Sequence, residues 1–189
     1  MNGFSRAATA RNLTGPALRA IYRLEVEGVG LVPAGGPLIL QIDGDGLLAG
    51  PVLKVVTPRP VHTIVSGALA EVLMGHSPGW AGDIALEGHG FAAYAAACAL
   101  LRSGEAVAIL GESSLLGPLL AASGAVVQPV TITGAGGKVA TDPPRPRSRI
   151  GIVFEAPITV TSSGDPCALA TVQQLRELVR QARADARSG

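Results

Sequence analysis

"PLILQIDGDGLLAGPVLKVV", residues 37–56, places an apolar run, a glycine-rich turn and a helix start in immediate succession. The run at residues 37–42 is almost wholly apolar, which is typical of a strand buried on both faces of a parallel sheet. Pro51 then favours a helix start, because proline is best tolerated in the first turn of a helix. The stretch therefore predicts the strand–turn–helix unit of an α/β domain.

The same alternation extends in both directions along the chain. "YRLEVEG" alternates like an edge strand, while "VHTIV", "DIALEG", "EAVAILG", "AVVQPVTITG" and "RIGIVFEAPITV" read as further strands. Helices are expected in "ALAEVLM" and over residues 89–102, and "GAGGKVATDPPRPRS" is expected to be a mobile loop. An apolar stripe near helical period predicts a terminal helix; it consists of Leu169, Val172, Leu175, Leu178, Val179 and Ala182. Arg176, Arg180, Arg183 and Arg187 lie off that stripe or at its end.

The predicted fold class is α/β, with a mixed central sheet flanked by helices. No repeat or linker divides the chain, so residues 1–189 are expected to form a single layered domain. Within it we expect an N-terminal helical segment at 1–21, an α/β core at 22–160 and a C-terminal helix at 166–187. In a short helix within "RNLTGPALRAIYRL", residues 11–24, Leu18, Ile21 and Tyr22 would share one side.

Composition excludes several classes of function. The chain is 48% hydrophobic with a formal charge of +1, which suits one buried core and gives no drive toward nucleic acid. Its longest uncharged apolar stretch, residues 90–101, is far shorter than the roughly 20 residues of a membrane span. No secretory signal is recognisable, so a cytoplasmic location is expected. Cys98 and Cys167 offer neither metal-ligand spacing nor a compelling disulfide, and no cofactor is expected.

The arginines of the N-terminal region leave two interpretations open. Arg6, Arg11, Arg19 and Arg23 precede the first acidic residue, Glu25. They either form a solvated face that packs over the domain or make peripheral contact with an anionic membrane.

The glycines of the opening stretch suggest a dinucleotide-binding loop. Gly44, Gly46 and Ala49 have the spacing of G-x-G-x-x-A. However, Asp45 places negative charge where pyrophosphate would bind, and the next strand, "VHTIVS", ends without the acid that would hold the ribose. The signal is therefore weak.

"AVAILGESS" suggests a serine-nucleophile elbow, but the pattern fails. Leu115 stands where the elbow needs its final glycine, and all three histidines, His62, His76 and His89, precede Ser113. An α/β-hydrolase expects its histidine after the nucleophile. Ser113 and Ser114 are more simply turn or helix-cap residues.

Taken as ordered blocks, residues 22–160 resemble the phospholipid/glycerol acyltransferase family. "LEVEGVGLVPAGGPLIL" looks like the family's lead-in, "GDIALEG" like its second block and "AVAILGESSLLG" like its third. "VVQPVTITG" closely matches the fourth block, and "RIGIVFEAPITV" looks like the closing strand. The resemblance implies the family's fold and a lipid or acyl thioester ligand.

The resemblance also implies that the catalytic residues are missing. Where the family has Asn-His, four residues and Asp, this chain has Asp43, Gly44 and Ala49. In the family the histidine deprotonates the acceptor hydroxyl and the aspartate orients it. A positioned base contributes typically about 10²–10⁴-fold, so its loss removes a major part of catalysis.

Arginines are missing from two further blocks. The second block keeps an acid at Glu87 but has Gly88 in the arginine position. The third block keeps Glu112 and a hydroxyl at Ser114 but has Leu115 in the arginine position. Phosphate recognition depends strongly on such bidentate cations, so the sequence predicts no phosphate-bearing acceptor.

Replacement chemistry remains open at four residues. His89 or Asp45 would act as an unusual base, although a solvated or helix-start histidine is the plainer interpretation of His89. Asp43, Asp45 and Glu112 would meet in one cleft, where they would bind a hard cation, raise one another's pKa, or simply cap turn amides. We favour capping, and predict no metal site.

Three functional hypotheses follow. The first is a catalytically degenerate acyltransferase-fold protein that binds a lipid or acyl chain, or supports a lipid-processing protein partner. The second is an active acyltransferase with a non-standard base and a non-phosphate acceptor. The third is a purely structural interaction protein. The expected ligand-binding residues are Asp43, Gly44, Asp45, Glu112, Ser113 and Ser114.

Overall fold

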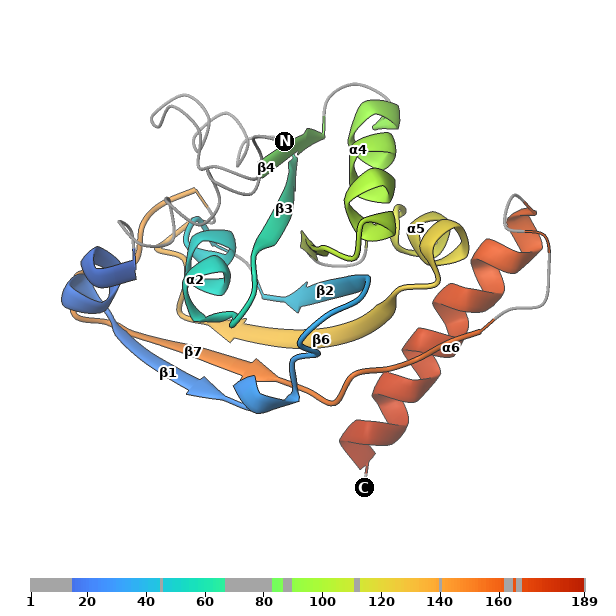
Figure 1. The fold of residues 1–189 in the computed structure, drawn as a ribbon. Coiled ribbons are helices and arrows are strands. Elements are labelled where there is room, and N and C mark those ends of the chain that lie inside the picture. The colour runs from blue at the N-terminus through green and yellow to red at the C-terminus, as the bar shows by residue number, and fades with distance from the viewer. Residues whose placement is uncertain are drawn as a thin grey trace.

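A computed structural model describes residues 15–44, 46–66, 83–86, 90–110, 113–139, 141–161, 165 and 168–188. These residues contain one seven-stranded mixed sheet, in the order β1-β7-β6-β2-β5-β3-β4. The predicted α/β class with helices on a mixed central sheet is confirmed (Figure 1). The strands are β1 Arg23–Glu27, β2 Leu38–Asp43, β3 Val61–Ser66, β4 Asp83–Leu86, β5 Ala106–Leu110, β6 Val126–Thr133 and β7 Arg149–Phe154.

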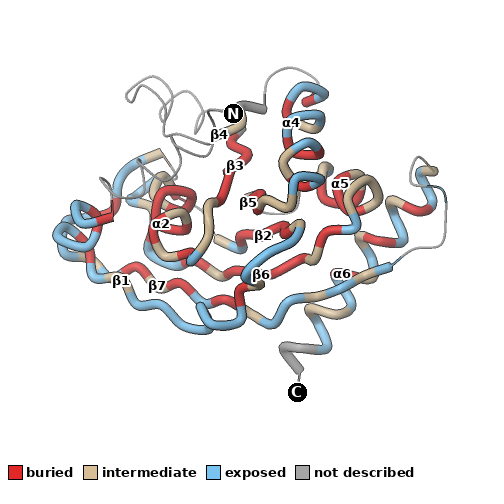
Figure 2. The backbone as a smooth tube through the Cα atoms, in the orientation of Figure 1, coloured by how far each residue is buried: buried red, intermediate tan, exposed pale blue. Residues whose placement is uncertain are grey.

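The opening stretch of the sequence forms the centre of the sheet. β2 pairs in parallel with β5 on one side and with β6 on the other. Leu38, Ile39, Leu40 and Ile42 are fully buried, so apolar side chains cover both faces of this strand. Figure 2 shows the same burial continuing through the neighbouring strands. The continuous apolar run is thus explained by a central position in a parallel array.

The sheet departs from the parallel pattern at the edge formed by β7 and β1. β7 is antiparallel to β6, and β1 pairs in parallel with β7 at the end of the sheet. β1 is the predicted edge strand, and Arg23, Glu25 and Glu27 on its exposed side place charge along the unpaired edge. Such charge discourages pairing with a further strand.

Helices cover the two faces and enclose two hydrophobic clusters. A helical segment at residues 15–21 and α2 (Ala49–Val56) pack on one face, around Leu18, Val52 and Leu53. On the other face lie α4 (Phe91–Arg102), α5 (Leu116–Ser123) and α6 (Leu169–Ser188), as Figure 1 shows. A short 3-10 helix, Val29–Leu31, follows β1. Among the described residues, no helix combines the length and apolarity that crossing a bilayer requires.

The boundaries of α2 agree with the role expected of Pro51. The helix begins at Ala49, so Pro51 lies in its first turn, where backbone N–H groups have no partner inside the helix. The helix predicted at residues 68–74 lies outside the described residues.

Two details of the sequence prediction need correction. Ile21 is 45% exposed although Leu18 and Tyr22 are buried, because the helical segment ends there and the chain turns into β1. Leu169 is 71% exposed, and only Leu175 and Val179 of the predicted stripe are deeply buried, in the hydrophobic cluster that includes α5.

The segment expected to be a mobile loop contains neither helix nor strand where it is described. Hydrogen bonds hold it against residues 21–22: the Arg147 N–H donates to Ile21 O at 2.7 Å, and the Tyr22 hydroxyl donates to Pro144 O at 3.3 Å. Its mobility stays a prediction.

Candidate functional site

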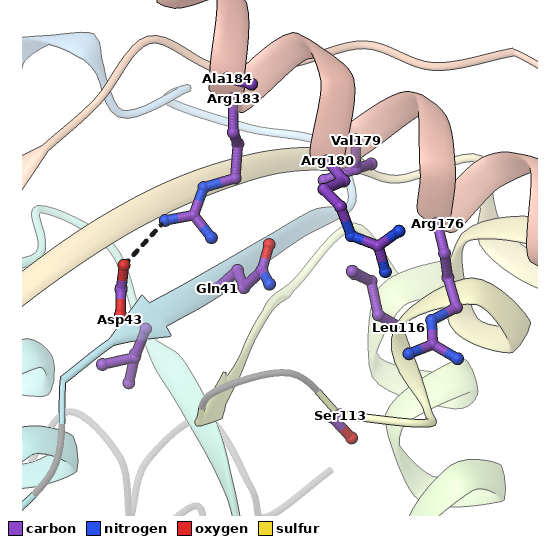
Figure 3. Close-up of a pocket in the computed structure, with 10 residues that line it drawn as sticks. Gln41, Asp43, Ser113, Leu116, Arg176, Val179, Arg180, Arg183 and Ala184 are labelled. Carbon is purple, nitrogen blue, oxygen red and sulfur yellow. Dashed lines mark hydrogen bonds and ion pairs between the residues drawn. The ribbon is translucent and has the colours of Figure 1, made fainter. Parts of the chain in front are cut away.

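A pocket of about 320 Å³ opens at the carboxyl end of β2. This is the edge at which ligands bind in open α/β sheets. The β2 strand, the turn before α5 and the inner side of α6 form its walls (Figure 3). Six lining residues are polar or charged: Gln41, Asp43, Ser113, Arg176, Arg180 and Arg183. Four are apolar: Ile42, Leu116, Val179 and Ala184.

Arg183 anchors α6 to the end of β2. Its Nη2 lies 3.3 Å from Asp43 Oδ2 and 4.0 Å from Glu155 Oε1, and its side chain is only 16% exposed. The Thr131 hydroxyl donates to the same Glu155 oxygen at 3.3 Å. Arg183 Nε is buried without a hydrogen-bond partner among the described residues. The guanidinium is therefore held by carboxylates yet keeps one unused donor.

Arg176 and Arg180 lie along the same side of the helix. With Arg183 they occupy positions i, i+4 and i+7, which share one helical face. Arg180 pairs with Glu177 on the exposed surface, whereas no described carboxylate lies within ion-pair distance of Arg176. Figure 3 shows both guanidiniums extending from α6 toward Ser113 and Leu116. The pocket wall therefore contains three guanidiniums, two of which pair with carboxylates.

Gln41 supplies a buried polar group from the sheet side. Its residue is 5% exposed, and its Oε1 has no hydrogen-bond partner among the described residues. Its amide lies between the side chains of Arg183 and Arg180 in Figure 3. A buried acceptor without a partner costs about 1–3 kcal/mol.

Gly44 and Gly46 are explained by close backbone packing. Gly44 has φ +135°, and a Cβ there would lie 2.1 Å from the carbonyl oxygen of Ile132. A Cβ at Gly46 would lie 2.3 Å from the backbone nitrogen of Gly136, and the Leu48 N–H donates to Ala135 O at 3.1 Å. The turn after β2 thus packs on residues 132–136, which cover the bare glycine backbone that a nucleotide loop would present to pyrophosphate.

The remaining sequence candidates have different surroundings. Asp43 lines the pocket and is half-exposed, and Ala49 is fully buried as the first residue of α2. Ser113 Oγ accepts the Leu115 N–H at 3.2 Å, which agrees with a turn role, and Ser114 is exposed. Asp45, His89 and Glu112 lie outside the described residues, as do His76 and Cys167. Their proposed roles, including the three-carboxylate cluster, stay predictions. Among the residues that the structure describes, no group of three or more His, Cys, Asp or Glu is placed to hold a metal ion.

His62 belongs to a separate cluster at the amino ends of β3 and β5, whereas the pocket lies at the carboxyl end of β2. Its Nε2 lies 2.5 Å from Glu105 Oε2, and both side chains are largely buried. Arg59 donates to Pro33 O at 3.2 Å and also to Gly104 O. Burial lowers the pKa of the Arg59 guanidinium, and the nearby Glu105 carboxylate opposes that lowering. These bonds tie together the loops at the amino ends of β3 and β5, so the cluster is structural.

The arginines of α6 were not identified as site residues from the sequence. The two motif positions lack arginine, and the guanidiniums at the end of β2 come from this helix instead. An acceptor without phosphate stays a prediction. The sequence signal was their i, i+4, i+7 spacing beside the buried Leu175 and Val179. That spacing predicts a shared face, but not what the face meets.

The sheet order, the helices on both faces and the pocket at the end of β2 define an α/β fold of the acyltransferase type. The solved structure of the 1-acyl-sn-glycerophosphate (LPA) acyltransferase PlsC from Thermotoga maritima is similar, with a TM-score of 0.59 and 14% sequence identity. The match covers 98% of this chain and 80% of that one. No family model matches the sequence, and no curated protein matches it either. The likeness thus concerns the fold.

Proposed function

We propose that this chain is a catalytically degenerate acyltransferase-fold protein that binds a lipid or acyl chain, or supports a lipid-processing partner. The observation that carries the proposal is the backbone at Gly44, where the family resemblance would put the catalytic histidine. Because a Cβ there would lie 2.1 Å from Ile132 O, this turn has no room for a side chain. The backbone at this position therefore supports the proposal independently of the sequence, because a histidine side chain would clash with Ile132 there.

The surroundings of Asp43 support the same conclusion. In the resemblance this position precedes the base, and here the carboxylate is engaged by Arg183 from α6. This ion pair occupies Asp43 Oδ2, which leaves fewer carboxylate lone pairs to accept a hydrogen bond from a substrate hydroxyl. The pocket thus offers ligand contacts more readily than proton abstraction.

A basic surface near the N-terminus supports contact with an anionic membrane. The Arg23 N–H donates to Ser148 O and the Arg147 N–H to Ile21 O, so residues 19–23 and 145–149 lie side by side. We name their exposed arginines the basic ridge: Arg19, Arg23, Arg145, Arg147 and Arg149. Arg149 pairs with Glu25 at 3.5 Å, so the other four carry most of the positive charge of the ridge. Ile21 and Val26, both partly exposed, lie beside it. Basic residues flanked by apolar ones suit the surface of an anionic bilayer.

The test is ligand binding measured together with turnover. Native mass spectrometry of the purified protein should detect a co-purifying lipid, and acyl-CoA or lipid should raise the melting temperature. No acyl-CoA cleavage above background is expected. Cleavage at an enzymatic rate would overturn catalytic degeneracy and support the active acyltransferase with a non-standard base. Absence of any lipid or acyl-CoA effect would instead leave the structural interaction protein as the better hypothesis.

A further inference from the structure

The outer edge of β1 combines exposed charge with exposed apolar side chains. β1 is the last strand at one end of the sheet, and four of its five residues are exposed (Figure 2). Among the described residues, eight large apolar side chains are exposed, and four of them fall within residues 21–31: Ile21, Val26, Val29 and Leu31. Apolar side chains that gather on a surface mark an interaction site. An edge strand also presents unpaired backbone N–H and C=O groups to a further strand.

The charges of β1 determine which strand can pair with it. Like charges that lie directly opposite each other are destabilising, so charge on an edge discourages a strand that does not complement it. β1 reads "RLEVE", with a positive charge at its first residue, Arg23, and a negative charge at its last, Glu27. In a second copy laid antiparallel to the first, with the two Glu25 residues opposite each other, Arg23 of each copy lies opposite the partner's Glu27.

The same register matches the other side chains of the strand. Leu24 lies opposite the partner's Val26 on one face of the sheet, and symmetry makes this contact twice. The two Glu25 carboxylates meet at the centre, but each is 3.5 Å from Arg149 of its own copy, which offsets part of their repulsion. A parallel arrangement in register would instead set Arg23 against Arg23. The antiparallel register pairs all five residues of β1 and forms two Arg–Glu pairs.

Apolar space on both sides of this register favours the same partner. A groove of about 430 Å³ opens between β1 and α2, so Leu24 and Val26 border a volume that a partner's side chains can fill. Ile21 precedes β1 and Val29 follows it, so the two-fold axis brings Ile21 of each copy toward the partner's Val29. The groove is lined by Arg19, Tyr22, Arg23, Leu24, Val26, Val29 and Val56.

We propose that this edge binds a second copy of the chain, through antiparallel pairing of β1 with the partner's β1 about a two-fold axis perpendicular to the sheet. The sheet then continues from one copy into the other. An interface of one strand and a few flanking side chains is small, so the dimer depends on protein concentration. This inference goes beyond the proposed function and does not rest on it. Arg19, Arg145 and Arg147 of the basic ridge lie outside the paired strand, so contact with an anionic membrane does not require them to leave the dimer.

Charge reversal tests the pairing in solution. Sedimentation velocity of the full chain over a wide concentration range should show a monomer–dimer equilibrium. Arg23→Glu and Glu27→Arg each set like charges opposite each other twice, so each variant alone should dimerise at least about tenfold more weakly. An equimolar mixture of the two variants should dimerise like the unchanged protein, because the reversed charges then face each other. Arg102→Glu, a charge reversal on the exposed last turn of α4, is the matched control and should have no effect.

A disulfide tests the register. Position 25 lies on the two-fold axis, so Glu25→Cys should form an intermolecular disulfide under mild oxidation. Leu24→Cys is the matched control and should not, because diagonal neighbours are about 7–8 Å apart, beyond the reach of a disulfide. The dimer is overturned if the unchanged protein is monomeric at every concentration, if the mixture does not restore association, or if both cysteine variants cross-link alike. If the reversals leave sedimentation unchanged but Arg23→Glu weakens vesicle binding, the edge belongs to the membrane-facing surface and the dimer is likewise overturned.

Discussion

The Arg183 guanidinium lies 3.3 Å from the Asp43 carboxylate and joins the C-terminal helix to the end of β2 across 140 residues of chain. We expect this pair to stabilise the fold modestly, because the Asp43 side chain is 52% exposed and therefore screened by water. A double-mutant cycle with Asp43→Asn and Arg183→Gln, followed by urea unfolding, should give a coupling energy of about 0.2–1 kcal/mol. The coupling should shrink at high salt; zero coupling at low salt would contradict it.

Gly44→His tests whether the base can be restored by one substitution. We expect it to destabilise the protein by at least about 1–3 kcal/mol, because the residue has φ +135° and its Cβ would meet Ile132 O. Acyl-CoA cleavage should stay at background. Gly30→His is the control, since a Cβ at Gly30 meets nothing within 4 Å, and its unfolding free energy should hardly change. A stable Gly44→His protein that cleaves acyl-CoA would refute this account of the turn.

Gly117 allows α5 and α6 to pack closely, so its substitution should disturb the pocket from a distance. An added Cβ would lie 2.6 Å from Val172 O and 2.9 Å from Arg176 Cγ. We expect Gly117→Ala to cost about 1–3 kcal/mol through overpacking and to weaken binding of lipid or acyl-CoA as α6 shifts. Chemical denaturation and the thermal shift caused by the ligand measure the two effects. Gly35→Ala, which has open space around its Cβ, should change neither.

His62 should matter for stability and not for the pocket. His62→Ala leaves the largely buried Glu105 without its partner, which costs about 1–3 kcal/mol. His62→Gln should recover part of that loss, since the glutamine amide can donate to Glu105. Binding of lipid or acyl-CoA should be the same in both variants, because the cluster lies at the amino ends of the strands. A specific loss of that binding in His62→Gln would show that the two regions are coupled.

The basic ridge should contribute to binding of anionic vesicles. Replacing Arg145 and Arg147 by glutamine should weaken binding to phosphatidylserine-containing vesicles by about fivefold per arginine, from roughly 1 kcal/mol for each basic residue at such a surface. Vesicle co-sedimentation at two salt concentrations measures this. Arg102→Gln should bind like the unchanged protein. Equal binding of all three proteins would exclude the ridge as the membrane-facing surface.

The strands were predictable because local sequence carries their signal. A nearly continuous apolar run such as residues 37–42 is typical of a strand that is buried on both faces. Proline is preferred in the first turn of a helix, so Pro51 indicated where α2 begins. The exposure of Ile21 and Leu169 was not predictable in the same way. A helical stripe defines a face, but the length of that face that reaches the core depends on neighbouring elements.

The candidate site also has features that the sequence predicts and features that only the tertiary structure reveals. By itself the sequence determined the α/β class, the central strand, and the absence of a histidine at position 44. Only the tertiary structure decided that Gly44 packs on Ile132 and that Arg176, Arg180 and Arg183 face the end of β2. The physical reason is that strand and turn propensities act between neighbours in the chain, whereas the charge of a pocket is the sum of side chains that folding brings together from distant segments.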